Sequence, residues 1–199
     1  MLIGGAGNDV CLVDGFDTIS ETSLYGLDLG GTDTIQAMIE YTLAGIDFVE
    51  VLEILGTAAI NGTGNALANT IVGAAAANTL NGLQGADVLS GGAGADAFVF
   101  STALGAGNID RITDFSVVAD TIRLDDAVFS RIAAGALAVS AFVANSSGLA
   151  ADAADRIIYE TDTGALWYDA DGSGVASTRV QFATLSAGLA LTSADFVVF

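Results

Sequence analysis

The residues best suited to chemistry in this sequence are aspartates that recur at fixed intervals within glycine-rich segments. Between Gly64 and Val99 a nine-residue unit repeats four times, as GNALANTIV, GAAAANTLN, GLQGADVLS and GGAGADAFV. Each unit opens with Gly, has Asn or Asp at its sixth place and has a large apolar residue at its eighth. Three constant columns through four units indicate a true internal repeat. Carboxylates beside uncovered backbone carbonyls supply the hard oxygen ligands that suit Ca²⁺.

These ligand places require a scaffold that repeats with the same period. Six residues of each unit suit a turn, and three suit a short strand whose middle side chain points inward. Two units then make one turn of a flattened right-handed coil, and successive turns pair as parallel strands about 4.8 Å apart. Loops on the same side are two units apart, so Asp87 faces the loop of Asn69 and Asp96 faces the loop of Asn78. We expect calcium between such loops.

The four units differ in ligand content. Leu67 and Ala76 replace the glycine at the fourth place of the first two units, whose sixth residues are Asn. We expect Gly64–Asn81 to be structural, with stacked Asn side chains that hydrogen-bond along the corner, and Gly82–Val99 to keep the ligand loops. No same-side pair within the array has two aspartates, so the expected affinity is at best in the weak range of about 10⁻⁴–10⁻³ M. The predicted ligand residues here are Gly82, Gly85, Asp87, Gly91, Gly92, Gly94 and Asp96.

Two further sites are predicted around the array. Residues 4–12, GGAGNDVCL, form a complete unit in which Gly4, Gly5, Gly7 and Asp9 are the candidate ligands, with Asp28 as a plausible partner. Downstream, Asp114 follows Asp96 by two units and would face it from the next layer. This makes the two the best two-carboxylate candidate, with an exposed acidic strand end as the alternative.

Another candidate loop lies near the C-terminus. In Asp169-Ala170-Asp171-Gly172-Ser173-Gly174, oxygen-bearing side chains at places one, three and five precede a glycine at place six, as at the start of an EF-hand loop. The twelfth place is Val180, where that loop needs a bidentate Glu. Asp169, Asp171 and Ser173 are therefore either a half-site completed from elsewhere or part of an ordinary turn.

Composition excludes most other chemistry. The 199 residues carry a formal charge of −19, with 24 acidic residues against 5 basic ones and no His. All five basic residues are Arg, so most general-base, zinc and Schiff-base chemistry is excluded, and we expect no enzyme activity. The negative field repels nucleic acid and attracts divalent cations. A 52% hydrophobic content favours a packed core over disorder. Cys11 occupies an inward place and is expected to be a core thiol.

The rest of the chain predicts an all-β protein. Residues 1–110 are expected to form a right-handed parallel β-roll, or β-helix solenoid, that is partly degenerate. Residues 111–199 are expected to form a β-rich cap. Strands are predicted over 110–115, 120–124 and 180–185, with a hairpin around Thr161–Gly164 and a short helix capped by Asp125 and Asp126 that runs to Arg131. Residues 132–145 fit either helix or loop. No segment is long and apolar enough to span a bilayer, so we expect no membrane insertion.

Two longer segments carry a family resemblance. Residues 32–73, TDTIQAMIEYTLAGIDFVEVLEILGTAAINGTGNALANTIVG, resemble the spacer between repeat blocks of bacterial hemolysin-type calcium-binding (RTX) proteins. Residues 96–126, DAFVFSTALGAGNIDRITDFSVVADTIRLDD, resemble the segment that closes the roll in serralysin-like and related RTX proteins. The unit GGAGADAFV fits the RTX nonapeptide pattern. The resemblance implies calcium-dependent folding and export by a type I system.

The resemblance also gives the tail a role. Type I exported proteins carry an uncleaved C-terminal signal, and LTSADFVVF, an acid followed by four apolar residues, resembles such a signal. No N-terminal Sec-type signal is visible. The chain opens almost inside a repeat unit, which suggests a fragment of a longer chain or a gene product that has lost its upstream part. We therefore expect a secreted, extracellular bacterial module that folds on calcium binding within a larger protein. The alternative is a metal-poor structural or adhesive solenoid.

Overall fold

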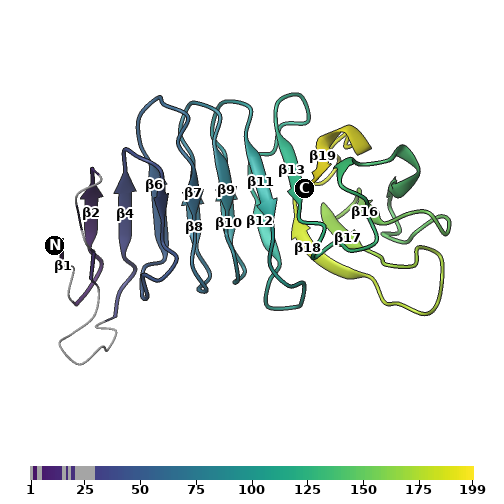
Figure 1. The fold of residues 1–199 in the computed structure, drawn as a ribbon, viewed down its shortest axis with the longest axis horizontal. Coiled ribbons are helices and arrows are strands. Elements are labelled where there is room, and N and C mark those ends of the chain that lie inside the picture. The colour runs from purple at the N-terminus through teal and green to yellow at the C-terminus, as the bar shows by residue number, and fades with distance from the viewer. Residues whose placement is uncertain (1, 4–5, 15–16, 18, 21–29) are drawn as a thin grey trace.

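The chain folds into a long stack of short parallel strands closed by a β-rich cap (Figure 1). The computed structural model describes residues 2–3, 6–14, 17, 19–20 and 30–199. The strands of the stack are β1 (Leu2–Ile3), β2 (Val10–Val13), β3 (Ile19–Ser20), β4 (Thr34–Ala37), β5 (Tyr41–Thr42), β6 (Val51–Ile54), β7 (Gly62–Thr63), β8 (Thr70–Val72), β9 (Thr79–Asn81), β10 (Val88–Ser90), β11 (Ala97–Phe100), β12 (Asp110–Ile112) and β13 (Thr121–Leu124).

Strands β1 and β3 pair with each other, and the other strands of the stack belong to two sheets. A ten-stranded sheet contains β2, β4, β6, β8, β10 and β12 in that order, and a seven-stranded sheet contains β5, β7, β9, β11 and β13. Within the array, Ile71 pairs with Leu89 in the first sheet and Leu80 with Phe98 in the second. Both pairs are two units apart in sequence, so the predicted parallel β-roll and its two-unit register are confirmed.

The eighth residue of each unit forms the core of the roll. In the ten-stranded sheet, Ile35, Leu52, Ile71, Leu89 and Ile112 follow one another in register, and none of them is more than 1% exposed. Leu80, Phe98 and Ile122 form the matching column of the other sheet, also fully buried. Burial of one such side chain per unit is what makes the stack stable, since a single unit cannot cover its own apolar residue. Cys11 extends the first column and is half-buried.

The cap continues both sheets of the roll. Its elements are β14 (Gly135–Ala136), a 3-10 helix (Val139–Ala141), β15 (Phe142–Asn145), β16 (Ile157–Glu160), β17 (Ala165–Tyr168), β18 (Val180–Thr184), a 3-10 helix (Ser193–Asp195) and β19 (Phe196–Val198). Strand β18 pairs in parallel with β12, and β19 pairs in parallel with β13. The predicted hairpin is confirmed as the antiparallel pair β16–β17. Strand β12 spans the expected boundary at residue 110.

The helix predicted over 125–131 is wrong. This segment is a series of turns in which Val128 and Phe129 both donate to the carbonyl of Asp125. Asp125 does act as a local cap, because its Oδ1 accepts the Ala127 N–H at 2.9 Å. The chain turns away because Phe129 is fully buried, with its ring 5.1 Å from those of Tyr168 and Phe182. Within the described residues, no helix is long and apolar enough to cross a membrane.

Candidate functional site

The sixth residues of the units form a column of carboxylate and amide side chains on each side of the roll. On the side of the ten-stranded sheet, the Asn69 N–H donates to Asp87 Oδ1 at 2.7 Å, and the Asp87 N–H donates to Asp110 Oδ1 at 3.1 Å. Each side chain thus accepts the backbone amide of the equivalent residue one turn earlier. The predicted facing of Asp87 with the Asn69 loop is confirmed, and Asp110 adds a second carboxylate directly next to Asp87.

The second column has the same arrangement and corrects one prediction. The Asn78 N–H donates to Asp96 Oδ1 at 2.8 Å, and the Asp96 N–H donates to Asp120 Oδ1 at 2.9 Å. Asp120, rather than Asp114, is therefore the residue that follows Asp96 in register. The expected two-unit step fails because the connection between β11 and β13 is longer, so that Ala97 pairs with Thr121.

Asp114 still lies beside the Asp96 loop. Its carboxylate accepts the N–H groups of Gly91 and Gly92 at 2.9 Å each, and the Ser90 hydroxyl at 2.7 Å. The structure therefore brings Asp96, Asp114 and Asp120 to one end of the array. Asp114 binds the glycine amides of that loop, while Asp120 occupies the ligand column.

Two buried oxygens in these columns have no partner. Asp87 Oδ2 and Asp96 Oδ2 are fully buried and accept no hydrogen bond, and the two residues are only 1% and 2% exposed. A buried charged oxygen without a donor is costly, so it calls for a cation or a proton. These are the atoms through which the columns can bind a metal.

Glycines lie directly against these oxygens and against neighbouring backbone carbonyls, where no side chain would fit. A Cβ on Gly82 would lie 2.0 Å from Asp87 Oδ2, and one on Gly91 would lie 2.4 Å from Asp96 Oδ2. Gly85 has φ +125° and faces the carbonyl oxygen of Leu67, which a Cβ there would meet at 2.2 Å. Gly92 and Gly94, with φ +84° and +137°, face Ala74 and Ala76 in the same way. The loops thus present carboxylate oxygens and backbone carbonyls together, a donor set that fits Ca²⁺.

The electrostatics of the carboxylates support this reading. Burial raises the pKa of Asp110 to about 7 and that of Asp87 to about 6, and the charge of Asp87 adds to the rise at Asp110. Burial also raises the pKa of Asp96, with further contributions from the charges of Asp120 and Asp114. These shifts show that the ionised carboxylates lack neutralising partners within the protein. A divalent cation supplies that neutralisation.

The asparagine units are satisfied without a cation. Asn69 Oδ1 accepts the Asn65 N–H at 2.8 Å, and Asn69 Nδ2 donates to the Val49 carbonyl at 3.1 Å. Asn78 Oδ1 accepts the Ala74 N–H at 2.8 Å, and its Nδ2 donates to the Ile60 carbonyl. The predicted hydrogen bonding of Asn along the corner is confirmed.

The N-terminal unit has a carboxylate ladder of its own. The Asp9 N–H donates to Asp33 Oδ1 at 2.9 Å, and the Asp33 N–H donates to Glu50 Oε2 at 3.0 Å. Asp9 Oδ2 is buried and unpartnered, and a Cβ on Gly31 would lie 2.0 Å from the Gly7 carbonyl oxygen. Asp33 thus takes the place that Asp28 was expected to fill. Gly4, Gly5 and Asp28 lie outside the described residues.

The candidate loop of the cap is tied mainly to itself. Asp171 Oδ2 accepts the N–H groups of Ala176 at 2.9 Å and Ser177 at 3.2 Å, while Asp171 Oδ1 is buried without a partner. Burial acts to raise the pKa of Asp171, but these hydrogen bonds outweigh it and lower the pKa. Asp169 Oδ1 accepts the Asp171 N–H at 3.2 Å, and burial raises the pKa of Asp169. Ser173 is exposed and donates its N–H to the Asp152 carbonyl.

The described side chains form pairs of carboxylates and no larger cluster. Within the part of the chain that the structure describes, no three His, Cys, Asp or Glu side chains converge as a metal cluster. The carboxylates come instead in pairs from successive turns, beside glycine loops that face backbone carbonyls of the preceding turn.

Four column residues were missed in the sequence, although the signal was present. Asp33, Glu50, Asp110 and Asp120 each lie two residues before an inward apolar residue, as Asp87 lies before Leu89. An acid–x–apolar search, free of the nine-residue spacing, finds all four: Asp33-Thr-Ile35, Glu50-Val-Leu52, Asp110-Arg-Ile112 and Asp120-Thr-Ile122.

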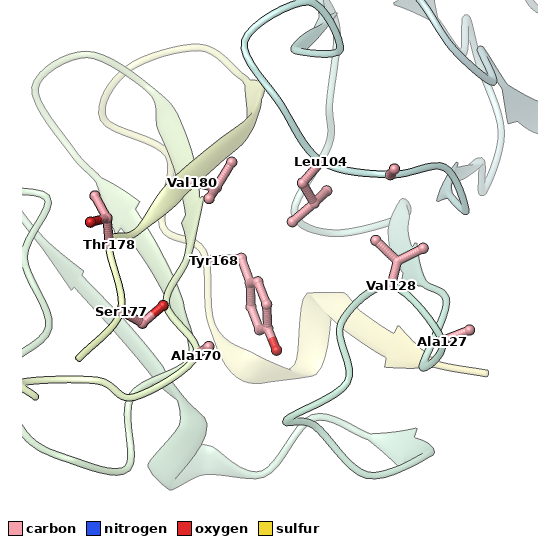
Figure 2. Close-up of a pocket in the computed structure, with 9 residues that line it drawn as sticks. Leu104, Ala127, Val128, Tyr168, Ala170, Ser177, Thr178 and Val180 are labelled. Carbon is pink, nitrogen blue, oxygen red and sulfur yellow. The ribbon is translucent and has the colours of Figure 1, made fainter.

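A separate cavity of about 370 Å³ lies between the roll and the cap. Leu104 and Val128 border it, together with Tyr168 and Val180 from β17 and β18 (Figure 2). Its lining is completed by Ala103, Ala127, Ala170, Ser177 and Thr178. No charged side chain lines this cavity, so it offers no acid–base pair.

Comparison with known protein families gives a match to the repeat array that contains these columns. Residues 63–98 match the family described as RTX calcium-binding nonapeptide repeat, in four copies. No curated protein matches the chain. The matched residues contain Asn69, Asn78, Asp87 and Asp96, and repeats of this family bind Ca²⁺. Residues 63–98 are therefore RTX-type repeats, and they support a calcium-binding module in this part of the chain.

Proposed function

We propose that the chain is the calcium-dependent folding and secretion domain of a larger extracellular bacterial protein. The observation that carries this proposal is the pair of buried, unpartnered carboxylate oxygens, Asp87 Oδ2 and Asp96 Oδ2, in the RTX repeats. Binding of calcium to such atoms stabilises only the folded state, because the unfolded chain does not hold the ligands together.

The residues that would hold calcium fall into two main groups. Asp87 and Asp110 would hold it on one side, with carbonyls of the Gly82–Gly85 loop. Asp96 and Asp120 would hold it on the other, with carbonyls of the Gly91–Gly94 loop. The ion supplies positive charge to carboxylates that the protein itself leaves unneutralised. Asp9 with Asp33, and Asp169 with Asp171 and Ser173, are proposed as further sites.

The same properties support the proposal of export by a type I system. The net charge of −19 disfavours a compact state when no cation is bound. In the tail that resembles an export signal, Phe196 and Val198 are buried in the folded cap at 1% and 2% exposed, whereas Val197 and Phe199 are 37% and 42% exposed. The buried side chains of this tail would be accessible to export machinery only before the cap forms. Folding would then follow in an extracellular medium rich in calcium.

We assign no catalytic role to the chain. It lacks His, its basic residues number 5, and the apolar cavity at the cap has no charged lining. The second candidate function is a metal-poor structural or adhesive solenoid, which the fully hydrogen-bonded Asn69 and Asn78 turns favour.

Circular dichroism and thermal melting in EGTA and in 10 mM CaCl₂ separate the two functions. Calcium-dependent folding predicts a large gain of β-sheet signal and melting temperature in calcium, with no comparable gain in MgCl₂. An identical signal and melting temperature in EGTA and in calcium would exclude calcium-dependent folding and favour the structural solenoid. Secretion is tested by removing residues 191–199 and measuring export from a type I-competent strain.

A further inference from the structure

Unsatisfied buried oxygens are unevenly distributed along the roll. Among the described residues of the roll, they belong to Asp9 on the upstream side and to Asp87 and Asp96 on the downstream side. From Thr34 to Asn81, a stretch that the structure describes without a gap, every fully buried side-chain nitrogen or oxygen has a hydrogen-bond partner. The middle of the roll thus needs no added donor, whereas both flanks do.

The difference arises at one place of the repeat. Asn69 and Asp87 occupy equivalent positions in adjacent turns, since Thr70 pairs with Val88. Both polar atoms of the Asn69 side chain are satisfied by the protein, one as an acceptor and one as a donor. Asp87 has the same shape but no N–H groups, and its Oδ2 has no partner. An asparagine carries the donor that an aspartate must obtain from outside.

The middle segment also has enough core to hold together. Strands β4, β6 and β8 on one sheet, and β5, β7 and β9 on the other, make three stacked turns. Leu43, Leu52, Ile71 and Leu80 lie within it and are fully buried. Three repeats are the number that solenoids usually need for stability.

We propose that residues 34–81 form a calcium-independent segment of the roll. Asn69 and Asn78 determine this property, because they provide side-chain N–H donors at the place where the Asp87 and Asp96 loops use a bound cation. This inference rests on the proposed calcium-dependent folding and restricts the calcium dependence to the turns outside residues 34–81. Calcium then orders the turns on either side of a segment that is already folded.

Hydrogen–deuterium exchange of the full chain, in EGTA and in 10 mM CaCl₂, tests the division. The amides of Thr70 and Leu80 should keep protection in EGTA to within about tenfold of that in calcium, while those of Leu89 and Phe98 should lose at least about a hundredfold. If calcium alters protection nowhere, the proposed function fails. If residues 34–81 lose as much protection as residues 82–124, the calcium-independent segment is refuted while calcium-dependent folding stands.

Substitution tests the role of the two asparagines. N69D and N78D remove the donor and create a second unpartnered oxygen, so each should lower the EGTA protection of residues 34–81 and raise the calcium bound at equilibrium dialysis. N61D is the matched control, because Asn61 Oδ1 accepts the Thr79 N–H at 2.9 Å and a carboxylate keeps that bond. Equal protection in N69D, N78D and N61D would overturn the assignment. Variants that fold only in calcium would support it, and loss of structure in calcium as well would refute it.

Discussion

Replacement of Asp110 by Asn should have opposite effects with and without calcium. Asp110 is 4% exposed, and its Oδ1 accepts the Asp87 N–H, a bond that the Oδ1 of an asparagine can keep. The substitution therefore removes a charge and leaves the acceptor in place. Without calcium it removes the cost of a buried charge and the repulsion with Asp87, and with calcium it removes a ligand charge.

The size of both effects can be worked from the site. A carboxyl pKa raised from about 3.9 to about 7 corresponds to about 4 kcal/mol against the ionised form in the fold. Because Asp87 and Asp110 titrate together, this cost belongs to the pair, and it is an upper limit for what removal of one charge can recover. In 10 mM calcium, one site with a Kd of about 10⁻⁴–10⁻³ M adds about 1.4–2.7 kcal/mol. D110N should thus gain stability in EGTA, by at most about 4 kcal/mol, and lose most of one calcium increment.

Urea denaturation at pH 7.5, in EGTA and in 10 mM CaCl₂, measures both quantities. D162N is the control, because Asp162 is an exposed carboxylate in the hairpin and its removal changes the net charge equally. D162N should stay within about 0.5 kcal/mol of the parent in each condition. The site assignment is refuted if D110N is destabilised by the same amount in both conditions, or if it keeps the full calcium increment.

The remaining predictions concern pH, the glycine loops and the core. In EGTA, the free energy of unfolding should fall as the pH rises from 4.5 to 7, because the Asp87–Asp110 pair binds more protons in the folded state than in the unfolded state. Calcium affinity should rise over the same pH range. Urea titrations in which the free energy of unfolding rises with pH would contradict the raised pKa values. G85A should destabilise the calcium form by about 3 kcal/mol, because Gly85 has a positive φ and its Cβ would contact the Leu67 carbonyl. G107A should change the melting temperature little, because no atom lies within 4 Å of its Cβ. Equal shifts of the melting temperature in the two variants would exclude a steric role for Gly85. L89A should lower the free energy of unfolding by about 2–5 kcal/mol, because Leu89 is fully buried. L149A should lower it by about 0.5 kcal/mol or less, because Leu149 is 56% exposed. Similar chemical-denaturation midpoints for the two variants would show that the Leu89 column does not stabilise the fold.

Sequence periodicity predicted the array well because backbone pairing and spacing coincide there. Asn69 pairs with Asp87, and Asn78 with Asp96, since each step between same-side strands contains two complete units. Beyond Phe100 the connections lengthen, and counting residues no longer identifies neighbours. The strands keep their register regardless, because it is set by inward residues such as Ile112 and Ile122 and not by loop length.

The cap was harder to predict because its contacts are distant in sequence. The hairpin turn at Thr161–Gly164 has a local signal, and it was found. The segment after Asp125 has a local helix-capping signal as well, but burial of Phe129 against Tyr168 and Phe182 decides its path. Asp33 was missed because only Gly30 and Gly31 of the repeat pattern precede it, and Glu50 because its loop lacks a glycine two residues before the acid.

The pairing of β19 with β13 has a consequence for how fast the molecule can assemble. Neighbouring strands of the roll come from successive turns, whereas Ile122 pairs with Phe196, which lies 74 residues further along the chain. Closing that longer loop costs about 1.3 kcal/mol more entropy than closing one turn of the array, if loop cost grows with the logarithm of length. The roll can therefore form turn by turn, while the pairing of β19 with β13 requires a less frequent encounter between distant segments. We expect two kinetic phases on refolding, with the slow phase reporting the arrival of the last strand.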